Sequence, residues 1–223
     1  KAQYTWKIAD HSATKVVMQM TGLDKQKKPV VLLTKTFQID PNSYSVKIWH
    51  TVKNLTNEPI SVTIDQLASN DLPRDNPRGD DRTFITAVLG SKKVIKVNQV
   101  EVTHAQIAKF TGSSKDLGAF SGATPTLWVA SENRFFAAIT RPEPTGANPV
   151  KLEDGREIQV ANNVADARVD ILRAGIPAND PTTAVTAIHL AGQAITVPAG
   201  GSEELALSVY LGPKKKDILD GQY

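Results

Sequence analysis

The chain has 223 residues, of which 40% are hydrophobic and 22% are charged, a composition typical of a globular protein with a sizeable core. The 26 basic and 23 acidic side chains give a net charge of only +3 and are not concentrated in any one segment, which argues against nucleic-acid binding. The chain contains no cysteine, so disulfides, thiolate metal sites and cysteine nucleophiles are excluded.

The extent of the chain indicates a piece of a larger protein. No apolar run approaches the roughly 18 to 20 residues of a membrane span. No signal peptide is visible and the sequence begins at Lys1, so we expect a fragment of something longer. Because no long linker or tandem repeat interrupts the pattern, we predict a single domain over residues 1–223.

The first third of the chain alternates between apolar and polar residues, as strands with one buried and one wet face do. The alternation predicts strands at residues 4–8 and 16–20, a polar connection at 22–29, and three consecutive strands at 31–39, 44–53 and 60–65. Turn residues separate these three strands, at 40–43 and 54–59. Asn54-Leu55-Thr56 also spells a glycosylation sequon, but we interpret it as part of the turn.

The rest of the chain continues with short strands and loops. We predict loops at 70–82, 112–125 and 141–155, a hairpin of buried strands at 127–130 and 135–139, and further strands at 84–89, 94–102, 167–171, 184–190, 193–197 and 205–211. Thr103 is the expected cap of a short helix to Phe110, and a second helix is expected to begin at Lys214–Leu219. About a dozen strands with little helical periodicity predict an all-β antiparallel sandwich.

A search for chemistry finds no active site. The four histidines are not spaced as zinc ligands, and the aspartates between Asp71 and Asp81 do not follow the pattern of a calcium loop. Nucleophile, phosphate-binding and metalloprotease motifs are absent. His50 lies on the apolar face of its strand, where a lone imidazole is usually a hydrogen-bonded core residue. We therefore predict no catalytic, cofactor-binding or metal-binding residue.

Three ordered motifs carry a family resemblance. They are Leu33–Ile60 (LTKTFQIDPNSYSVKIWHTVKNLTNEPI), the pair Trp128-Val129-Ala130 and Phe135–Ile139, and the ending Tyr210-Leu211-Gly212-Pro213-Lys214. Together they resemble the large periplasmic domain of the bacterial YidC membrane-protein insertase. The resemblance spans most of the chain, although the loops at 70–82 and 141–155 match nothing in the family.

The resemblance implies a β-supersandwich with galactose-mutarotase-like architecture and a short C-terminal helix. It implies a non-catalytic domain on the periplasmic face of the bacterial inner membrane, accessory to the insertion and folding of membrane proteins. It also implies Sec translocon subunits and nascent membrane proteins as partners, with no cofactor. A groove or an exposed sheet on such a domain suits an extended segment bound by strand addition.

Two alternatives use the same architecture. An aldose-epimerase-like enzyme requires a histidine and a carboxylate in one cleft, with His50 or His104 opposite Glu101 or Asp65. A carbohydrate-binding module requires an exposed indole ring on Trp6, Trp49 or Trp128. The leading candidate is Trp49, which lies on the polar face of its strand, and a buried Trp49 would count against this alternative. The run Lys214-Lys215-Lys216 is either a solvated helix start or a contact with a membrane surface.

Overall fold

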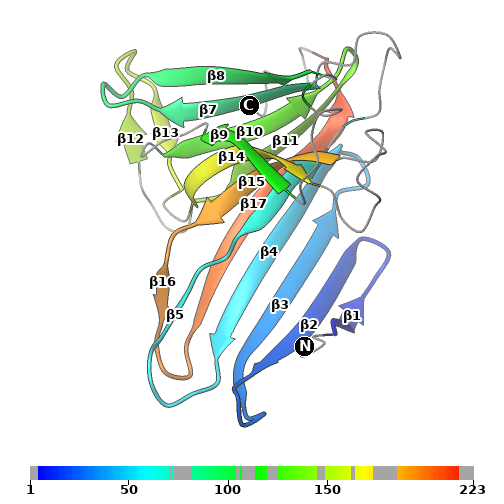
Figure 1. Ribbon diagram of the computed structural model, residues 1–223, viewed down its shortest axis with the longest axis vertical. Helices are drawn as coiled ribbons and strands as arrows, with labels where there is room; N and C mark the ends of the chain where they lie inside the picture. Colours follow the sequence, from blue (N-terminus) through cyan, green and yellow to red (C-terminus); the bar gives the residue numbers. More distant parts are fainter. Residues whose placement is uncertain are drawn as a thin grey trace.

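The fold is built from antiparallel strands. The computed structural model describes residues 5–70, 72, 82–103, 106, 114–119, 125–144, 149–161, 164–172 and 185–215 (Figure 1). Every element with defined bounds in these ranges is a β-strand, and the paired strands run antiparallel. The predicted all-β antiparallel class is therefore confirmed.

A nine-stranded sheet runs through the whole molecule (Figure 1). In spatial order its strands are β1 (Lys7–His11), β2 (Lys15–Leu23), β3 (Pro29–Ile39), β4 (Ser45–Asn54), β17 (Ser202–Pro213), β11 (Phe136–Pro142), β10 (Thr126–Glu132), β7 (Arg82–Leu89) and β8 (Ile95–Val102). The last strand among the described residues, β17, is inserted between β4 and β11 and so joins the N-terminal meander to the rest of the sheet.

A second, four-stranded sheet packs on one face of the first. Its strands, in spatial order, are β6 (Gln66–Asn70), β15 (Val185–Gly192), β14 (Val164–Leu172) and β9 (Ser114–Ala119). Two small ladders complete the fold. They are β5 (Ile60–Val62) with β16 (Ile195–Val197), and β12 (Pro149–Lys151) with β13 (Glu157–Gln159).

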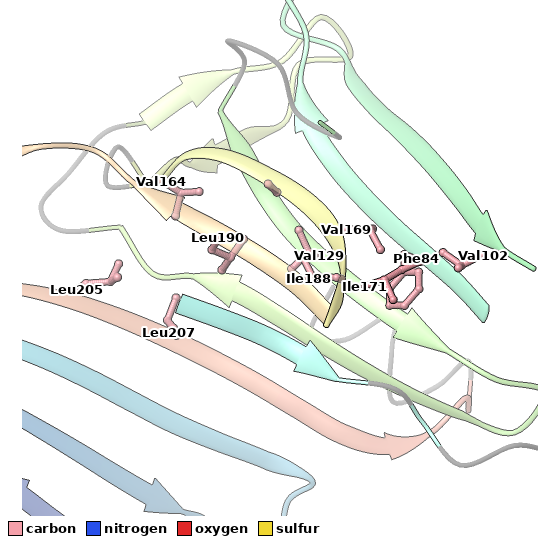
Figure 2. Close-up of a cluster of buried hydrophobic side chains, with 11 residues drawn as sticks. Phe84, Val102, Val129, Val164, Val169, Ile171, Ile188, Leu190, Leu205 and Leu207 are labelled. Atoms are coloured by element: carbon pink, nitrogen blue, oxygen red, sulfur yellow. The ribbon is translucent and has the colours of Figure 1, made fainter. Parts of the chain in front are cut away.

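The main core lies between the two sheets (Figure 2). Branched residues of β14 and β15 face those of β7, β8, β10 and β17, as their period-two alternation requires. The buried members of this cluster are Phe84, Val102, Val129, Val164, Ala167, Val169, Ile171, Ile188, Leu190, Leu205 and Leu207. The cluster contains no residue of β1, β2 or β3, so the second sheet covers only part of the first.

The β10–β11 hairpin is buried on both faces, as its nearly continuous apolar runs predict. Val129 belongs to the main core, whereas Ala130, Ala137 and Ile139 pack with Tyr210 in a second cluster on the opposite face. Tyr210 is fully buried there. The central strands are therefore enclosed on both sides, while β1–β3 are not.

The turn after β4 is held by the side chain of Asn54, which is fully buried. Its Nδ2 donates to the carbonyl oxygens of Glu58, Val197 and Pro198 at 2.7, 3.1 and 3.1 Å, and its Oδ1 accepts from the backbone NH of Thr56 at 2.8 Å. One side chain thus joins the β4–β5 turn to the β16–β17 turn. The turn interpretation of the sequon is confirmed.

The third predicted strand of the N-terminal meander ends sooner than its alternation suggests, and it leaves the sheet. β5 stops at Val62 and pairs with β16 rather than with β4. The backbone then runs to β6, where it crosses to the second sheet. Gly192 permits this crossing, because a Cβ at that position would collide with the carbonyl oxygen of Ile64.

Several other predictions need correction or lie outside the described residues. The predicted loops at 112–125 and 141–155 contain β9 and β12, which lack apolar alternation and are held by pairing with distant or local partners. Gln106 is helical and forms a capping box with Thr103 (Thr103 N to Gln106 Oε1, 2.8 Å), but most of the helix predicted there lies outside the described residues. So does most of the predicted loop at 70–82. The first strand begins at Lys7, three residues later than predicted.

The predicted C-terminal helix also lies largely outside the described residues, since only its first two positions are described and neither is helical. Within the described part of the chain, no helix has the length and apolarity needed to cross a membrane.

Candidate functional site

An open groove lies where the second sheet leaves the first uncovered. Its floor is formed by the core-side faces of β3 and β4, and the segment 62–67 forms one wall. The groove has a volume of about 650 Å³, within the range of sites that bind small molecules or a few side chains. The lining residues are Trp6, Val31, Leu33, Thr34, Lys35, His50, Thr51, Val52, Val62, Thr63, Ile64, Asp65, Gln66 and Leu67.

Apolar side chains dominate the surface of the groove. Leu33 and Val52 are directly opposite each other across β3 and β4. Trp6 is 37% exposed and Leu67 is 47% exposed, so both present apolar surface to solvent at this position. Exposed apolar surface that lines a concavity is typical of a binding region.

Two polar side chains are placed together within this apolar floor. Lys35 and His50 are cross-strand partners on β3 and β4. The His50 side chain is almost fully buried, and its Nδ1 has no hydrogen-bond partner among the described residues. Burial lowers the pKa of His50 to about 4, with a further contribution from the nearby charge of Lys35. His50 is therefore neutral at pH 7. We expected a hydrogen-bonded core histidine, and its Nδ1 lacks the expected hydrogen bond to a described residue.

Lys35 occupies an amphipathic position. Its Nζ lies 5.5 Å from the centroid of the Phe37 ring, within the range of a cation–π contact. Partial burial lowers the pKa of Lys35. The floor of the groove thus places the Lys35 ammonium, a hydrogen-bond donor, beside the aliphatic side chains of Leu33 and Val52.

The acid–base pair required by the enzyme alternative is not formed at this groove. Asp65 lines the groove, but its Oδ1 accepts the backbone NH of Gly192 at 3.1 Å, which gives the carboxylate a structural role. Glu101 lies on β8, five strands away from β4 in the sheet, and accepts from Gln99 at 3.0 Å. His104 lies outside the described residues.

A histidine and a carboxylate do approach each other elsewhere, on the second sheet. Asp170 Oδ2 lies 3.6 Å from His189 Nδ1, and Asp170 Oδ1 lies 3.5 Å from Arg168 Nε. Arg168 and His189 are cross-strand partners on β14 and β15, and neither they nor Asp170 line the groove. Sequence reasoning missed this cluster because His189 reaches Arg168 and Asp170, which lie two residues apart on β14, only through the β14–β15 register.

The three tryptophans occupy different environments. Trp49, the leading candidate for an exposed sugar platform, is half-buried on the face of β4 opposite the groove. Trp128 is half-buried and packs against the Tyr210 cluster. Only Trp6 combines an exposed ring with a concave surface.

No metal site was found in the part of the chain that the structure describes, since no three His, Asp or Glu side chains there converge suitably. Most of the aspartate-rich segment between Asp71 and Asp81 lies outside this part.

The two packed antiparallel sheets form a β-sandwich, and solved structures with the predicted galactose-mutarotase-like fold align with it. A galactose mutarotase related enzyme from Lactobacillus acidophilus aligns with a TM-score of 0.57 at 7% identity, over 95% of this chain and 72% of that protein. A galactose mutarotase-like protein from Lactobacillus casei aligns with a TM-score of 0.52 at 11% identity, over 92% of this chain and 72% of that protein. The Slr1438 protein from Synechocystis aligns with a TM-score of 0.54 at 8% identity, over 94% of this chain and 66% of that protein. At such identities the likeness shows the fold alone.

The family is shown by the sequence itself. The family model described as the YidC periplasmic domain matches residues 3–222, which is essentially the whole chain. The chain therefore belongs to the YidC periplasmic domain family, and the resemblance carried by the three motifs is confirmed.

Proposed function

We propose that this chain is a non-catalytic accessory domain of a YidC-type membrane-protein insertase, on the periplasmic face of the bacterial inner membrane. It assists the insertion and folding of membrane proteins through protein–protein contacts. The observation that carries this proposal is the open apolar groove, whose one histidine is neutral and whose one carboxylate is bound to a backbone amide. Such a site suits binding better than proton transfer.

The occupants that fit the groove are extended segments of nascent membrane proteins or of Sec translocon subunits. β1 is one of the two edge strands of the nine-stranded sheet and is exposed along its length. An added strand beside β1 would direct alternate side chains toward the face that carries Trp6 and Leu33. A bulge between Ile8 and Asp10 interrupts the β1–β2 register, so the added ladder is short.

Site-specific crosslinking tests this proposal in the insertase that contains the domain. A photo-crosslinking residue at Leu67, which lines the groove, is expected to capture a nascent membrane protein or a translocon subunit. The matched control is Val97 on β8, which is 61% exposed and does not line the groove. Equal crosslinking from the two positions, or none from either, contradicts the proposal.

A second candidate is an aldose-epimerase-like enzyme, favoured by the contact between His189 and Asp170. Polarimetry of freshly dissolved α-D-galactose tests it directly. We expect the chain to leave the rate of mutarotation unchanged. A rate above that of buffer that disappears in a His189→Ala variant would establish the enzyme instead.

A further inference from the structure

One end of the nine-stranded sheet carries a compact tip made of the β10–β11 turn and the end of β17, residues 132–136 and 211–215. Phe136 pairs with Pro213, and the backbone NH of Lys214 donates to the carbonyl oxygen of Phe135 at 2.8 Å. Asn133 Oδ1 accepts the backbone NH groups of Phe135 and Phe136 at 3.0 and 2.7 Å. The tip is therefore held in one conformation, which lowers the entropy cost of binding.

Three large apolar side chains of this tip are open to solvent. Phe135 is 57% exposed, Phe136 is 49% exposed and Leu211 is 53% exposed. Phe136 pairs with Pro213 and Ala138 pairs with Leu211, so Phe136 and Leu211 are diagonal neighbours on one face of the sheet. Neighbouring exposed apolar side chains of this size indicate an interaction surface.

Basic groups surround these apolar side chains. The Arg134 guanidinium lies 5.3 Å from the centroid of the Phe135 ring, and Lys214 and Lys215 follow β17. Glu132 is the one carboxylate on the tip, and it lies 2.8 Å from Lys214 Nζ. Because the neighbouring β3–β4 turn adds Asp40, the local excess of positive charge is small, and the apolar groups must supply most of any binding.

We propose that this tip docks on the surface of a membrane that contains anionic lipids. Phe135, Phe136 and Leu211 enter the boundary between headgroups and acyl chains, while Arg134 and Lys215 contact lipid phosphates. Aromatic side chains flanked by Lys and Arg are the composition of membrane-interface anchors. Lysine is depleted in protein–protein interfaces, so the flanking lysines favour a lipid surface over a protein partner. This proposal does not depend on the occupant of the groove.

Co-sedimentation with vesicles tests the proposal on the 223-residue chain. We expect the chain to bind vesicles of phosphatidylglycerol mixed with phosphatidylcholine more strongly than vesicles of phosphatidylcholine alone. Replacing both aromatics (Phe135→Ser with Phe136→Ser) is expected to weaken binding by about tenfold, because most of the inserted apolar area is lost. Val97→Ser is the matched control, since Val97 is 61% exposed on β8, three strand spacings or about 14 Å from β11. It is expected to leave vesicle binding unchanged.

A second variant acts through charge and spares the apolar packing. Lys215→Glu is expected to weaken binding to the mixed vesicles several-fold and to leave binding to phosphatidylcholine alone unchanged. Circular dichroism confirms that each variant is folded. The proposal is overturned if the unmodified chain binds neither vesicle, or if the double serine variant binds as well as the unmodified chain. The first of these results would leave the tip to a protein partner.

Discussion

Tyr210 lies over Gly212, two residues further along β17, and donates a hydrogen bond from Oη to the carbonyl oxygen of Pro213 at 2.6 Å. A Cβ built on Gly212 would lie 2.7 Å from Cζ and Oη of Tyr210 and 2.8 Å from Cγ of Tyr44. The two tyrosine rings meet edge to face with centroids 6.0 Å apart. The Tyr-x-Gly-Pro order in this chain is thus a packing requirement, because only glycine leaves room for both rings.

Gly212→Ala is therefore expected to destabilise the fold by about 2 kcal/mol, as overpacking a buried site does. Urea unfolding measures the change. Gly155→Ala is the contrasting variant, because Gly155 has open space around it but a positive φ of 87°. It should cost about 1 kcal/mol through backbone strain alone. Equal losses for the two variants would mean that the tyrosine rings yield freely.

Asn54→Ala is expected to lower the free energy of unfolding by about 3 kcal/mol. The change leaves the carbonyl oxygens of Glu58, Val197 and Pro198 without their shared donor and opens a cavity at a fully buried position. Thermal unfolding should show the loss clearly. The control is Asn57→Ala in the same turn, where the side chain is exposed and the change should be small. A large effect at Asn57 would contradict the role assigned to Asn54.

The fold class could be predicted from the sequence because period-two alternation identifies strands with one buried face. β3 and β4 match their predicted ranges closely for this reason. The sequence does not reveal β12, which has only three residues and begins with proline, or β9, which is mostly polar and small residues. Pairing with other strands holds both. The departure of β5 from the sheet was also invisible, since its alternation resembles that of an in-sheet strand.

The position of the groove could not be predicted. It depends on how far the second sheet extends over the first and on the path of segment 62–67 beside β3 and β4, and neither is visible in the sequence. His50 was singled out by its place on an apolar face, which is a local signal. Lys35 was not, since its position opposite His50 depends on the β3–β4 register. The contact between His189 and Asp170 likewise depends on the register between β14 and β15.

Gly192→Ala is expected to displace the groove wall. The added Cβ would collide with the backbone of Ile64, and backbone cannot rotate away as a side chain can. We expect a loss of about 2 to 3 kcal/mol and faster hydrogen exchange in residues 62–67. Asp65→Asn changes the same contact while preserving an acceptor for the Gly192 amide, and it should cost less than 1 kcal/mol. Unchanged hydrogen exchange at 62–67 in Gly192→Ala would contradict the close packing of this segment against Gly192.

The stability of the domain should fall in acid through His50. Burial, and secondarily the charge of Lys35, lowers its pKa in the folded state from 6.5 to about 4. Between these two values the unfolded chain binds the proton more tightly, so the free energy of unfolding rises with pH in this window. The shift corresponds to about 2 kcal/mol between pH 7 and pH 4, after allowance for the open side of the groove.

Urea unfolding of the unmodified chain and of His50→Gln, at several pH values between 4 and 7, isolates this contribution, because the carboxylates titrate in both proteins. The free energy of unfolding of the unmodified chain, minus that of His50→Gln, should fall as pH falls from 6.5 to 4. Lys35→Met removes the neighbouring charge, but burial is the larger cause of the shift, so most of the pH dependence should persist. A difference that stays constant with pH would mean that His50 titrates normally in the fold, and that water reaches its imidazole through the groove.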